Sequence, residues 1–477
     1  MQDTDTIAAI ASALNDAGIG IVRVSGRDAI AACEEILSDA SGKQTLSLRK
    51  ANTIRFGYVL CEDGEILDEA LISVLRAPFS YTGEDTVEIN VHGGAFVLRK
   101  TLQRVLTGTK GKVRLALPGE YTKRAFFNGK IDLTKAEAVQ DIISSQNAFA
   151  LKNAAKQLSG VLGDRIRAMR TALLAESALI EASLDDPDVY AAELDGYAER
   201  LSKTIGALKA EADALLQSSA EGVLRKDGIP CAIVGAPNTG KSTLLNALLG
   251  KERAIVTDIP GTTRDVLREQ VMIGEWMLLL SDTAGMRETP DPAEQIGVAR
   301  AKEEADSAAL LLLVADMTKD ISEAGEVLSS LPKELPVICL LNKKDLLEEE
   351  AVMRAQRRAE EYFREKDKKN RVRCVIATSF TAREGLDALS DGIDAVFLRE
   401  DTAARGEYYL TNERHREALL LAKEAFARVE ESIRNGVSEE FYTVDLLEAA
   451  GALGSITGED VTEELIDKIF SEFCMGK

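Results

Sequence analysis

The chain has 477 residues, of which 45% are hydrophobic and 29% are charged, a composition typical of multidomain globular proteins. Its formal net charge of −21 argues against a protein that binds nucleic-acid backbones through its own charge. No uninterrupted apolar run reaches the ~20 residues of a membrane helix, and the start MQDTDTIAAIASA lacks the basic residues of a signal peptide. We therefore expect a cytoplasmic protein without a membrane anchor.

The six cysteines are spread singly along the chain. They form no C-x-x-C pair, which argues against a zinc site or a thioredoxin-like site. Such usage is typical of a reducing compartment. Cys231 and Cys339 lie inside apolar runs, so we expect them to pack as small hydrophobic side chains.

Four regions of the chain differ in their hydrophobic pattern. Residues 1–119 contain short Val- and Ile-rich runs closed by glycine, which predict a mixed α+β domain. Apolar residues at helical spacing predict helices over 120–225 and again over 396–477. In 226–395, helices alternate with the apolar runs IPCAIV, WMLLLSD, ALLLLVAD, VICLLN and RCVIATS, which are typical of parallel strands. The predicted fold class is multidomain α/β plus α, with an α/β domain inserted into a helical domain.

A phosphate-binding loop follows the first of these strands. The segment GAPNTGKS, Gly235 to Ser242, fits G-x-x-x-x-G-K-[ST] between a strand and a helix, the context that the motif requires. Its glycines let backbone N–H groups approach phosphates, and the helix N-terminus favours their negative charge. We expect Lys241 to reach the β- and γ-phosphates and Ser242 to bind Mg²⁺. A glycine-rich turn without a ligand is the remote alternative.

Two further segments at strand ends predict that the base is guanine. DTAG, which begins at Asp282, can hold Mg²⁺ through water and sense the γ-phosphate. NKKD ends at Asp345, whose carboxylate can accept two hydrogen bonds from guanine N1–H and its amino group, a donor pair that adenine lacks. A third base contact is expected at Ser379, although Phe380 stands where related domains carry alanine.

Together these segments predict a GTP site that resembles the translation-factor-like branch of small G domains. The residues expected to bind GTP are Asn238, Thr239, Gly240, Lys241, Ser242, Thr243, Thr257, Asp258, Ile259, Pro260, Gly261, Thr262, Thr263, Asp282, Thr283, Ala284, Gly285, Asn342, Lys343, Asp345 and Ser379. The expected Mg²⁺ ligands are Ser242 and Thr263.

The glutamine that orients the attacking water in Ras-like enzymes is missing, because Met286 occupies its place. Asn238 in the phosphate loop and the threonine-rich segment VTDIPGTTRD offer oxygen atoms that can hold a monovalent cation against the phosphates. Such a cation would offset the charge that develops in the transition state. Alternatively, Asn238 only shapes the loop and the acidic run after Met286 is a solvated segment.

The whole chain resembles the bacterial and organellar tRNA-modification GTPase family known as MnmE or TrmE. The resemblance covers nearly all 477 residues. It is carried by the segments SYTGEDTVEINVHGG, LPGEYTKRAFFNGKIDLTKAEAV, GTTRD with DTAGMRE, and FCMGK. Three of these four lie partly or wholly outside the predicted GTPase domain.

The resemblance implies a GTPase whose domains dimerise across bound K⁺ and need no activating protein. It implies that Asn238, Thr257, Ile259 and Thr262 are the K⁺ ligands. It also implies that Glu294 is the catalytic carboxylate that orients water, with Arg287 as a structural or switch residue nearby.

The resemblance also implies a Ras-like P-loop GTPase domain inserted into the helical domain, and an N-terminal domain that dimerises and binds 5-formyl- or 5,10-methylene-tetrahydrofolate. The matching folate residues are Arg23, Glu88, Lys130 and Lys477. Arg23 taken by itself fits a surface salt bridge equally well. The stretch IASALNDAG before Arg23 departs from the family, because it lacks proline and is more helix-like.

The function that the resemblance implies is modification of C5 of the wobble uridine of tRNA, with an aminomethyl or carboxymethylaminomethyl group. The partners would be a second copy of the chain and an FAD-dependent MnmG-type protein, in a heterotetramer or larger complex. Two alternatives remain open: a ribosome-assembly GTPase of the Era or Der kind, and a nucleotide-regulated scaffold. The acidic helical tail disfavours the first, which needs a basic RNA-binding domain.

The segment FCMGK contains Cys474, four residues from Phe470 of the preceding predicted helix. It fits a prenylation signal poorly, because Lys477 and Gly476 are outside the usual residue types. A metal site lacks partners, since the chain has two histidines and no paired thiols. The resemblance implies that Cys474 is a catalytic nucleophile or redox thiol beside the folate, with a pKa that the nearby lysine can lower.

Overall fold

The computed structural model describes residues 5–44, 46, 50, 52–250, 269–280, 308–331, 335–398, 408–474 and 476. The chain forms two compact units. The first comprises Met1–Ile143, Gln157–Ile205 and Leu420–Lys477, and the second comprises Ser144–Lys156 and Gly206–Leu419. The finer domain borders after residues 119, 225 and 395 remain predictions.

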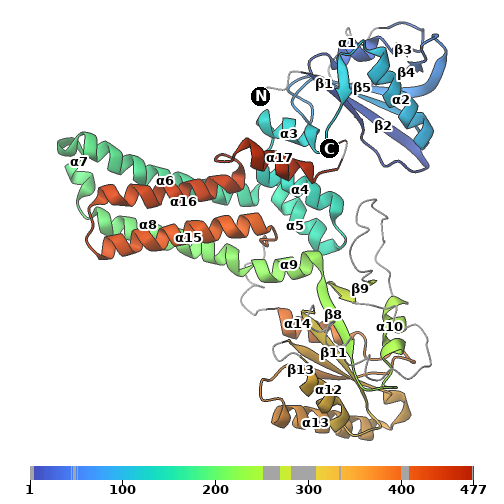
Figure 1. The fold of residues 1–477 in the computed structure, drawn as a ribbon, viewed down its shortest axis with the longest axis vertical. Coiled ribbons are helices and arrows are strands. Elements are labelled where there is room, and N and C mark those ends of the chain that lie inside the picture. The colour runs from blue at the N-terminus through green and yellow to red at the C-terminus, as the bar shows by residue number, and fades with distance from the viewer. Residues whose placement is uncertain are drawn as a thin grey trace. The chain divides into compact units, whose positions relative to one another are not determined.

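A seven-stranded sheet with the order β3-β4-β5-β6-β2-β1-β7 organises the start of the first unit. Buried side chains of its strands pack against α1 and α2 in one hydrophobic core (Figure 1). The central strands β2 and β6 are antiparallel, and their register places Arg23 opposite Glu88. The elements are β1 (Thr6–Ile10), β2 (Ala17–Ser25), α1 (Ala29–Glu34), β3 (Leu37–Asp39), β4 (Thr53–Leu60), β5 (Ile66–Leu75), β6 (Thr86–Gly93), α2 (Ala95–Gly108) and β7 (Val113–Leu115).

The stretch IASALNDAG was expected to be helix-like, and this expectation is wrong. Ile10 ends β1, residues 11–16 form bends, and β2 begins at Ala17. The reason is tertiary: β1 and β2 pair antiparallel, with Ile10 opposite Val22, so that residues 11–16 must reverse the chain between the two strands. Pairing of this kind overrides the helical preference of an alanine-rich sequence.

Within the described residues, the chain is helical from Glu120 to Asp227 and from Glu413 to Ser471 apart from short connections, as the hydrophobic pattern predicts. The long helices α6 and α16 pack side by side within the first unit (Figure 1). The side chain of Arg170 on α6 joins Glu459 and Asp460 just after α16. These helices are α3 (Glu120–Phe127), α4 (Leu133–Ser144), α5 (Ala148–Leu158), α6 (Val161–Asp185), α7 (Pro187–Leu194), α8 (Tyr197–Gln217), α9 (Ser219–Asp227), α15 (Glu413–Arg434), η3 (Glu439–Phe441), α16 (Tyr442–Thr457) and α17 (Glu463–Ser471).

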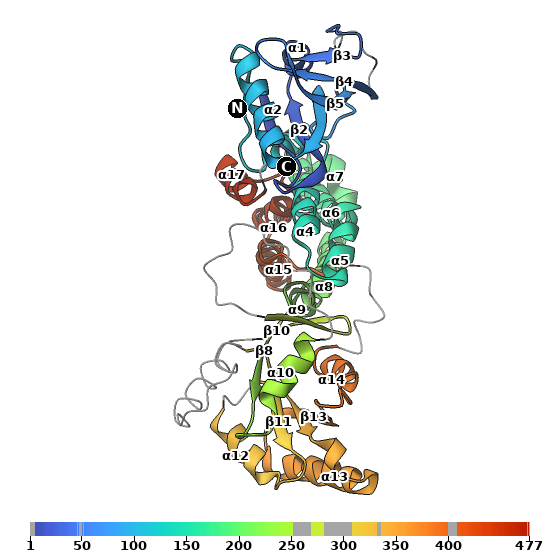
Figure 2. The same cartoon turned by 90° about the vertical axis from the view of Figure 1, so that its right-hand side faces the viewer.

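The second unit contains a six-stranded sheet with the order β13-β12-β11-β8-β10-β9 (Figure 2). All five predicted apolar runs are strands, and their neighbouring pairs are parallel. The edge strand β9, which the sequence analysis did not include, is antiparallel to β10. The elements are β8 (Ile229–Val234), α10 (Lys241–Leu249), β9 (Glu269–Ile273), β10 (Trp276–Leu280), β11 (Leu310–Asp316), α12 (Ser322–Ser330), β12 (Val337–Asn342), η2 (Lys344–Leu346), α13 (Glu349–Lys366), β13 (Val372–Ala377) and α14 (Ala388–Phe397).

Hydrophobic clusters lie on both faces of this sheet, which explains why its strands read as continuous apolar runs. Cys231 and Cys339 are fully buried in these clusters, and this confirms their predicted packing role. Within the described ranges, none of the helices is long and apolar enough to cross a membrane.

Candidate functional site: a nucleotide-binding loop and a polar site at Arg23

The phosphate loop connects β8 to α10, and its backbone conformation explains its sequence. Gly240 has a φ of 104° and Asn238 a φ of 60°, both in the left-handed region. A Cβ atom on Gly240 would overlap the side-chain amide of Asn342, so that only glycine fits there. The loop thereby places the first N–H groups of α10 at the carboxyl end of the sheet, where α/β proteins bind phosphates.

Lys241 begins α10 and its ammonium group folds back over the loop. Its Nζ atom donates to the backbone carbonyls of Gly235 and Ala236, each at 2.9 Å. Burial lowers the pKa of Lys241, because desolvation disfavours the charged form. A partly buried cation of this kind favours an anionic ligand such as a phosphate. Ser242, the predicted Mg²⁺ ligand, follows it with an exposed side chain, as does Thr243.

A single side chain joins the phosphate loop to the base-recognition loops. The amide of Asn342 donates to the carbonyl of Thr239 at 2.9 Å, and its Oδ1 atom accepts the Phe380 N–H at 3.2 Å. Asn342 is buried, so both bonds are shielded from water. Its role as a bridge was not predicted, and a pattern such as NKKD gives no signal for it.

The predicted base loop forms around Asp345. The Ser379 hydroxyl donates to Asp345 Oδ1 at 2.6 Å and fixes the exposed carboxylate, while the second carboxylate oxygen has no bond to Ser379. Phe380 is buried and belongs to the core of the unit, so its bulk is accommodated. However, its N–H is already used by Asn342.

Lys343 of the same loop has an unpredicted partner. Its Nζ atom lies 2.5 Å from Oδ2 of Asp316, the last residue of β11. Burial raises the pKa of Asp316, but hydrogen bonds from Lys343 and Thr318 outweigh it, so that the pKa is lower than usual. The charged pair holds Lys343 beside the strand ends.

Several predicted residues lie outside the described residues. They are Thr257, Asp258, Ile259, Pro260, Gly261, Thr262, Thr263, Asp282, Thr283, Ala284, Gly285, Arg287, Glu294 and Lys477. Their roles in binding GTP, Mg²⁺, K⁺ or folate therefore remain predictions.

In the first unit, Arg23 on β2 lies at the centre of a second polar site. Its Nε atom donates to Glu88 Oε1 at 2.8 Å, and its Nη1 atom donates to the carbonyl of Gly476 at 3.3 Å. The guanidinium carbon lies 5.6 Å from the centre of the Tyr121 ring. The structure therefore brings Arg23 and Glu88 together with the C-terminal segment.

Lys130 and Cys474 are placed differently from this pair. The Lys130 ammonium donates to the Pro78 carbonyl at 2.8 Å and has no recorded bond to Arg23 or Glu88 within the described part of the chain. Cys474 is exposed, and its carbonyl accepts the Gly119 N–H at 3.4 Å. Gly119 has a φ of 66° and touches the end of α17, so that the tail is docked through backbone contacts.

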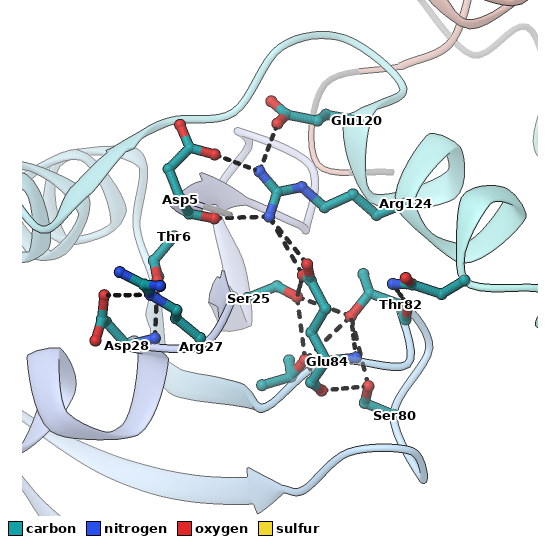
Figure 3. Close-up of polar contacts among 12 residues, drawn as sticks. Asp5, Thr6, Ser25, Arg27, Asp28, Ser80, Thr82, Glu84, Glu120 and Arg124 are labelled. Carbon is teal, nitrogen blue, oxygen red and sulfur yellow. Dashed lines mark hydrogen bonds and ion pairs between the residues drawn. The ribbon is translucent and has the colours of Figure 1, made fainter. Parts of the chain in front are cut away.

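A buried charge network fixes the segments around this site (Figure 3). Arg124 on α3 donates to Glu120 at 2.8 Å, to Asp5 Oδ1 at 2.9 Å and to Glu84 at 3.1 Å. Glu84 in turn accepts the Ser25 hydroxyl at 2.8 Å. The network links α3, which carries Tyr121, with β2, which carries Arg23, and with the segment just before β6, the strand that carries Glu88. It was not predicted, although Glu84, Glu120 and Arg124 lie in the quoted family segments.

Glu120 remains ionised within this network. Burial raises the pKa of its carboxyl, but hydrogen bonds from Arg114, the Leu117 N–H and Arg124 outweigh burial, so the pKa lies below its usual range. The Arg114 guanidinium contributes two of these bonds, at 2.6 and 2.8 Å. The charge of Glu120 is therefore balanced by two arginines.

The second unit combines a sheet that is parallel except for its edge strand β9, a phosphate loop before α10, and Asp345 held by Ser379 in the base loop. These features define a P-loop GTPase domain. Two family models match this chain, one before the GTPase domain and one over a range that includes it. The model described as the GTP-binding protein TrmE N-terminus matches residues 6–130, and the model of the MnmE helical domain matches residues 133–474.

Relatives match over nearly the full length. A protein from Lachnoclostridium phytofermentans is 41% identical, covering 99% of this chain and 100% of its own. Proteins from Thermoanaerobacter pseudethanolicus and Carboxydothermus hydrogenoformans are 40% and 41% identical, each covering 99% of both chains. All three are named tRNA modification GTPase MnmE. The chain belongs to the MnmE (TrmE) family.

Proposed function

We propose that this GTPase acts with an FAD-dependent MnmG-type partner to modify C5 of the wobble uridine of tRNA. The group installed is aminomethyl or carboxymethylaminomethyl, and its carbon comes from 5-formyl- or 5,10-methylene-tetrahydrofolate. The observation that supports GTP binding is the Asn342 bridge, which joins the phosphate loop to the predicted guanine-binding loop. Full-length similarity to tRNA modification GTPases favours this function over the Era or Der alternative.

The side chains of the phosphate loop and the base loop suit GTP with Mg²⁺, because they offer a hydroxyl, an ammonium and a carboxylate group. The Ser242 hydroxyl at the start of α10 would hold Mg²⁺ together with Thr263, and the ion would neutralise phosphate charge. Lys241, which donates to two carbonyls of its own loop, would turn to the β- and γ-phosphates. Asp345, with the Ser379 hydroxyl on one oxygen, would accept hydrogen bonds from guanine.

We place a K⁺ ion at Asn238, with Thr257, Ile259 and Thr262 as its other ligands. Asn238 is exposed and its left-handed backbone is typical of a residue that shapes a ligand-binding loop. The ion would supply positive charge to the transition state. Glu294 would orient the attacking water, since no glutamine follows the DTAG segment.

GTP hydrolysis in KCl should be at least about tenfold faster than in NaCl at the same ionic strength, because one well-placed positive group in such a site is worth at least that much. Phosphate release measured in both salts tests this expectation. In the variant Asn238→Gly, the left-handed backbone is tolerated but the side-chain oxygen is lost, so the preference for K⁺ should disappear. Equal slow rates of the wild type in both salts would contradict the cation-assisted mechanism and favour a scaffold.

The polar site around Arg23 in the first unit would hold the folate. Arg23 can bind a carboxylate of the glutamate tail, and Glu88 can accept hydrogen bonds from the amino edge of the pterin. Their ion pair shows that the two groups balance each other's charge before a ligand arrives. Lys130 and Lys477 would add positive charge from neighbouring segments. Cys474 follows α17 in the docked tail and would act on the one-carbon unit or on the base.

The variant Cys474→Ser should lose tRNA modification while it retains GTP hydrolysis, because the thiol belongs to the first unit and the nucleotide loops belong to the second. Nucleoside analysis of tRNA from cells that carry only this variant measures the first property, and phosphate release measures the second. Cys61→Ser, a partly buried cysteine elsewhere in the first unit, is the matched control. Normal wobble modification in the Cys474→Ser strain would remove this thiol from the mechanism.

We also propose that the first unit forms a homodimer through its sheet. The face of the sheet opposite α1 and α2 exposes large apolar side chains, which are Ile19, Ile54, Phe56 and Leu71. Gly18, Ile19, Phe56, Leu71 and His92 also line a shallow hollow on it. Apolar faces of this kind are typical of protein interfaces, and a second copy of the same sheet would cover it symmetrically.

A further inference from the structure

The Arg225 side chain in the second unit is enclosed by aromatic rings. Its guanidinium carbon lies 4.9 Å from the ring centre of Trp276, 5.1 Å from that of Phe149 and 5.7 Å from that of Tyr409. The side chain is only 13% exposed, and Glu221 one turn earlier on α9 lies 3.2 Å from its Nε atom. We call Arg225, Phe149, Trp276 and Tyr409 the arginine cage.

Each residue of the cage comes from a different segment. Arg225 belongs to α9, which leads directly into β8 and the phosphate loop, whereas Phe149 belongs to α5 (Figure 1). Trp276 is the first residue of β10, and Tyr409 lies in the extended segment before α15. The guanidinium on α9 therefore contacts the three other segments, which suits arginine better than lysine because a planar guanidinium can stack on aromatic faces.

Two asparagine side chains hold the helical side of the cage together through hydrogen bonds to the backbone. Asn147 donates to the carbonyls of Arg225 and Lys226 at 3.0 and 3.2 Å. Asn153 on α5 exchanges two bonds of 2.9 Å with the backbone of Tyr409. As a result, α5, the end of α9 and the segment around Tyr409 form one assembly.

Trp276 joins this assembly to β10 and α14. Its indole N–H donates to Asp394 on α14 at 2.8 Å, so the ring is held in one orientation. Its strand β10 ends at Leu280, two residues before Asp282 of the DTAG segment. The chain therefore leads from β10 directly into a segment that is predicted to bind the nucleotide, and at its other end Trp276 of β10 contacts Arg225 of α9.

We propose that Arg225 is a positioning residue that couples the nucleotide state of β10 to α9 and α5. This inference rests on the proposed function, because it supplies the step by which GTP hydrolysis reaches the helices and, through them, the modification chemistry. Arg225 has no recorded contact with the described residues of the phosphate loop or the base loop. Its removal should therefore uncouple hydrolysis from modification without stopping hydrolysis.

Trp276 is the only tryptophan of the chain, and it makes the proposal measurable. In the wild type, its emission should differ between GDP and a non-hydrolysable GTP analogue, and hydrogen exchange of α5 and α9 should differ as well. In Arg225→Ala, the emission should still respond, but the difference in exchange of α5 and α9 should be lost. The rate of tRNA modification should fall about tenfold relative to GTP hydrolysis, within the range measured for residues that carry coupling.

Arg371→Ala is a matched control for the loss of a buried arginine. Arg371 is 11% exposed and pairs with Asp367 one turn earlier, as Arg225 pairs with Glu221, but it lies between α13 and β13 without a recorded contact to β10. It should retain both nucleotide responses and the normal ratio of modification to hydrolysis. An equal fall of this ratio in Arg371→Ala would identify a stability effect and overturn the proposal.

Three other results would also overturn it: no nucleotide-dependent change of exchange in the wild-type α5 and α9, an unchanged response of these helices in Arg225→Ala, or normal modification by that variant. A failure of the proposed function can be told apart from these results, because in that case the wild type itself would hydrolyse no GTP or would leave tRNA unmodified. The variant Arg225→Lys keeps the charge and loses the stacking, so it should behave like Arg225→Ala.

Discussion

The variant Asp345→Asn should lower kcat/KM for GTP by about 10³-fold or more, as expected for a site that hydrogen-bonds its substrate and then loses the pairing. The same variant should prefer xanthosine triphosphate. The guanine amino group needs an acceptor, which the carboxylate provides, whereas xanthine presents a carbonyl oxygen that an asparagine N–H can reach. Phosphate release with each nucleotide measures both efficiencies.

The geometry makes this exchange feasible. Asn has the size of Asp and retains an oxygen for the Ser379 hydroxyl, which now binds Asp345 Oδ1 at 2.6 Å. Asp391→Asn, at an exposed position of α14, is the control and should leave both efficiencies unchanged. If Asp345→Asn still preferred GTP, guanine would be read by another group, and the assignment of the NKKD segment would be wrong.

The variant Arg124→Ala should lower the free energy of unfolding of the first unit by about 3–5 kcal/mol, the usual cost of removing one partner from a buried ion pair. Its guanidinium is 6% exposed and balances Glu120, which is 4% exposed, and also Glu84 and Asp5. Urea unfolding followed by circular dichroism, with hydrogen exchange to assign the transition to the first unit, tests the prediction.

The control for Arg124 is Arg167→Ala. Arg167 also joins two carboxylates, those of Asp132 and Asp164, but its side chain is 36% exposed, so the loss should be about 1 kcal/mol or less. The stability that Glu120 contributes is present above its unfolded pKa and is lost as the pH falls through its lowered folded pKa. The difference between wild type and Arg124→Ala should therefore narrow in acid. A difference that is independent of pH would assign the effect to packing.

The sheet of the second unit was predictable because its strands bury both faces. Runs such as VICLLN, Val337 to Asn342, have no polar residue before the strand end, and this pattern fits a parallel strand between two helical layers. The phosphate loop was predictable because the left-handed backbone at Gly240 needs glycine, so the motif is visible in the local sequence. β9 was missed, because its short run EQVMI has no such continuity.

Features that depend on tertiary contacts were not predictable. The stretch before β2 has an alanine-rich pattern that suits a helix, and only its two neighbouring strands make it a strand and a turn. The arginine cage unites Phe149, Arg225, Trp276 and Tyr409, which are separated by dozens of residues and follow no spacing rule. Arg23 and Glu88 were expected at one site from a resemblance alone, and their ion pair, which was not expected, follows from the register of β2 against β6.

The Asn342 amide has a consequence for competing ligands. One side chain is bonded to both the phosphate loop and the base loop. We therefore expect binding of the phosphates and binding of the guanine base to depend on each other. A fragment such as guanosine or pyrophosphate stabilises one loop and must still bear the ordering cost of the other. The binding free energies of guanosine and pyrophosphate should therefore add up to less than that of GTP. An inhibitor that competes with GTP should contact both the phosphate loop and the base loop.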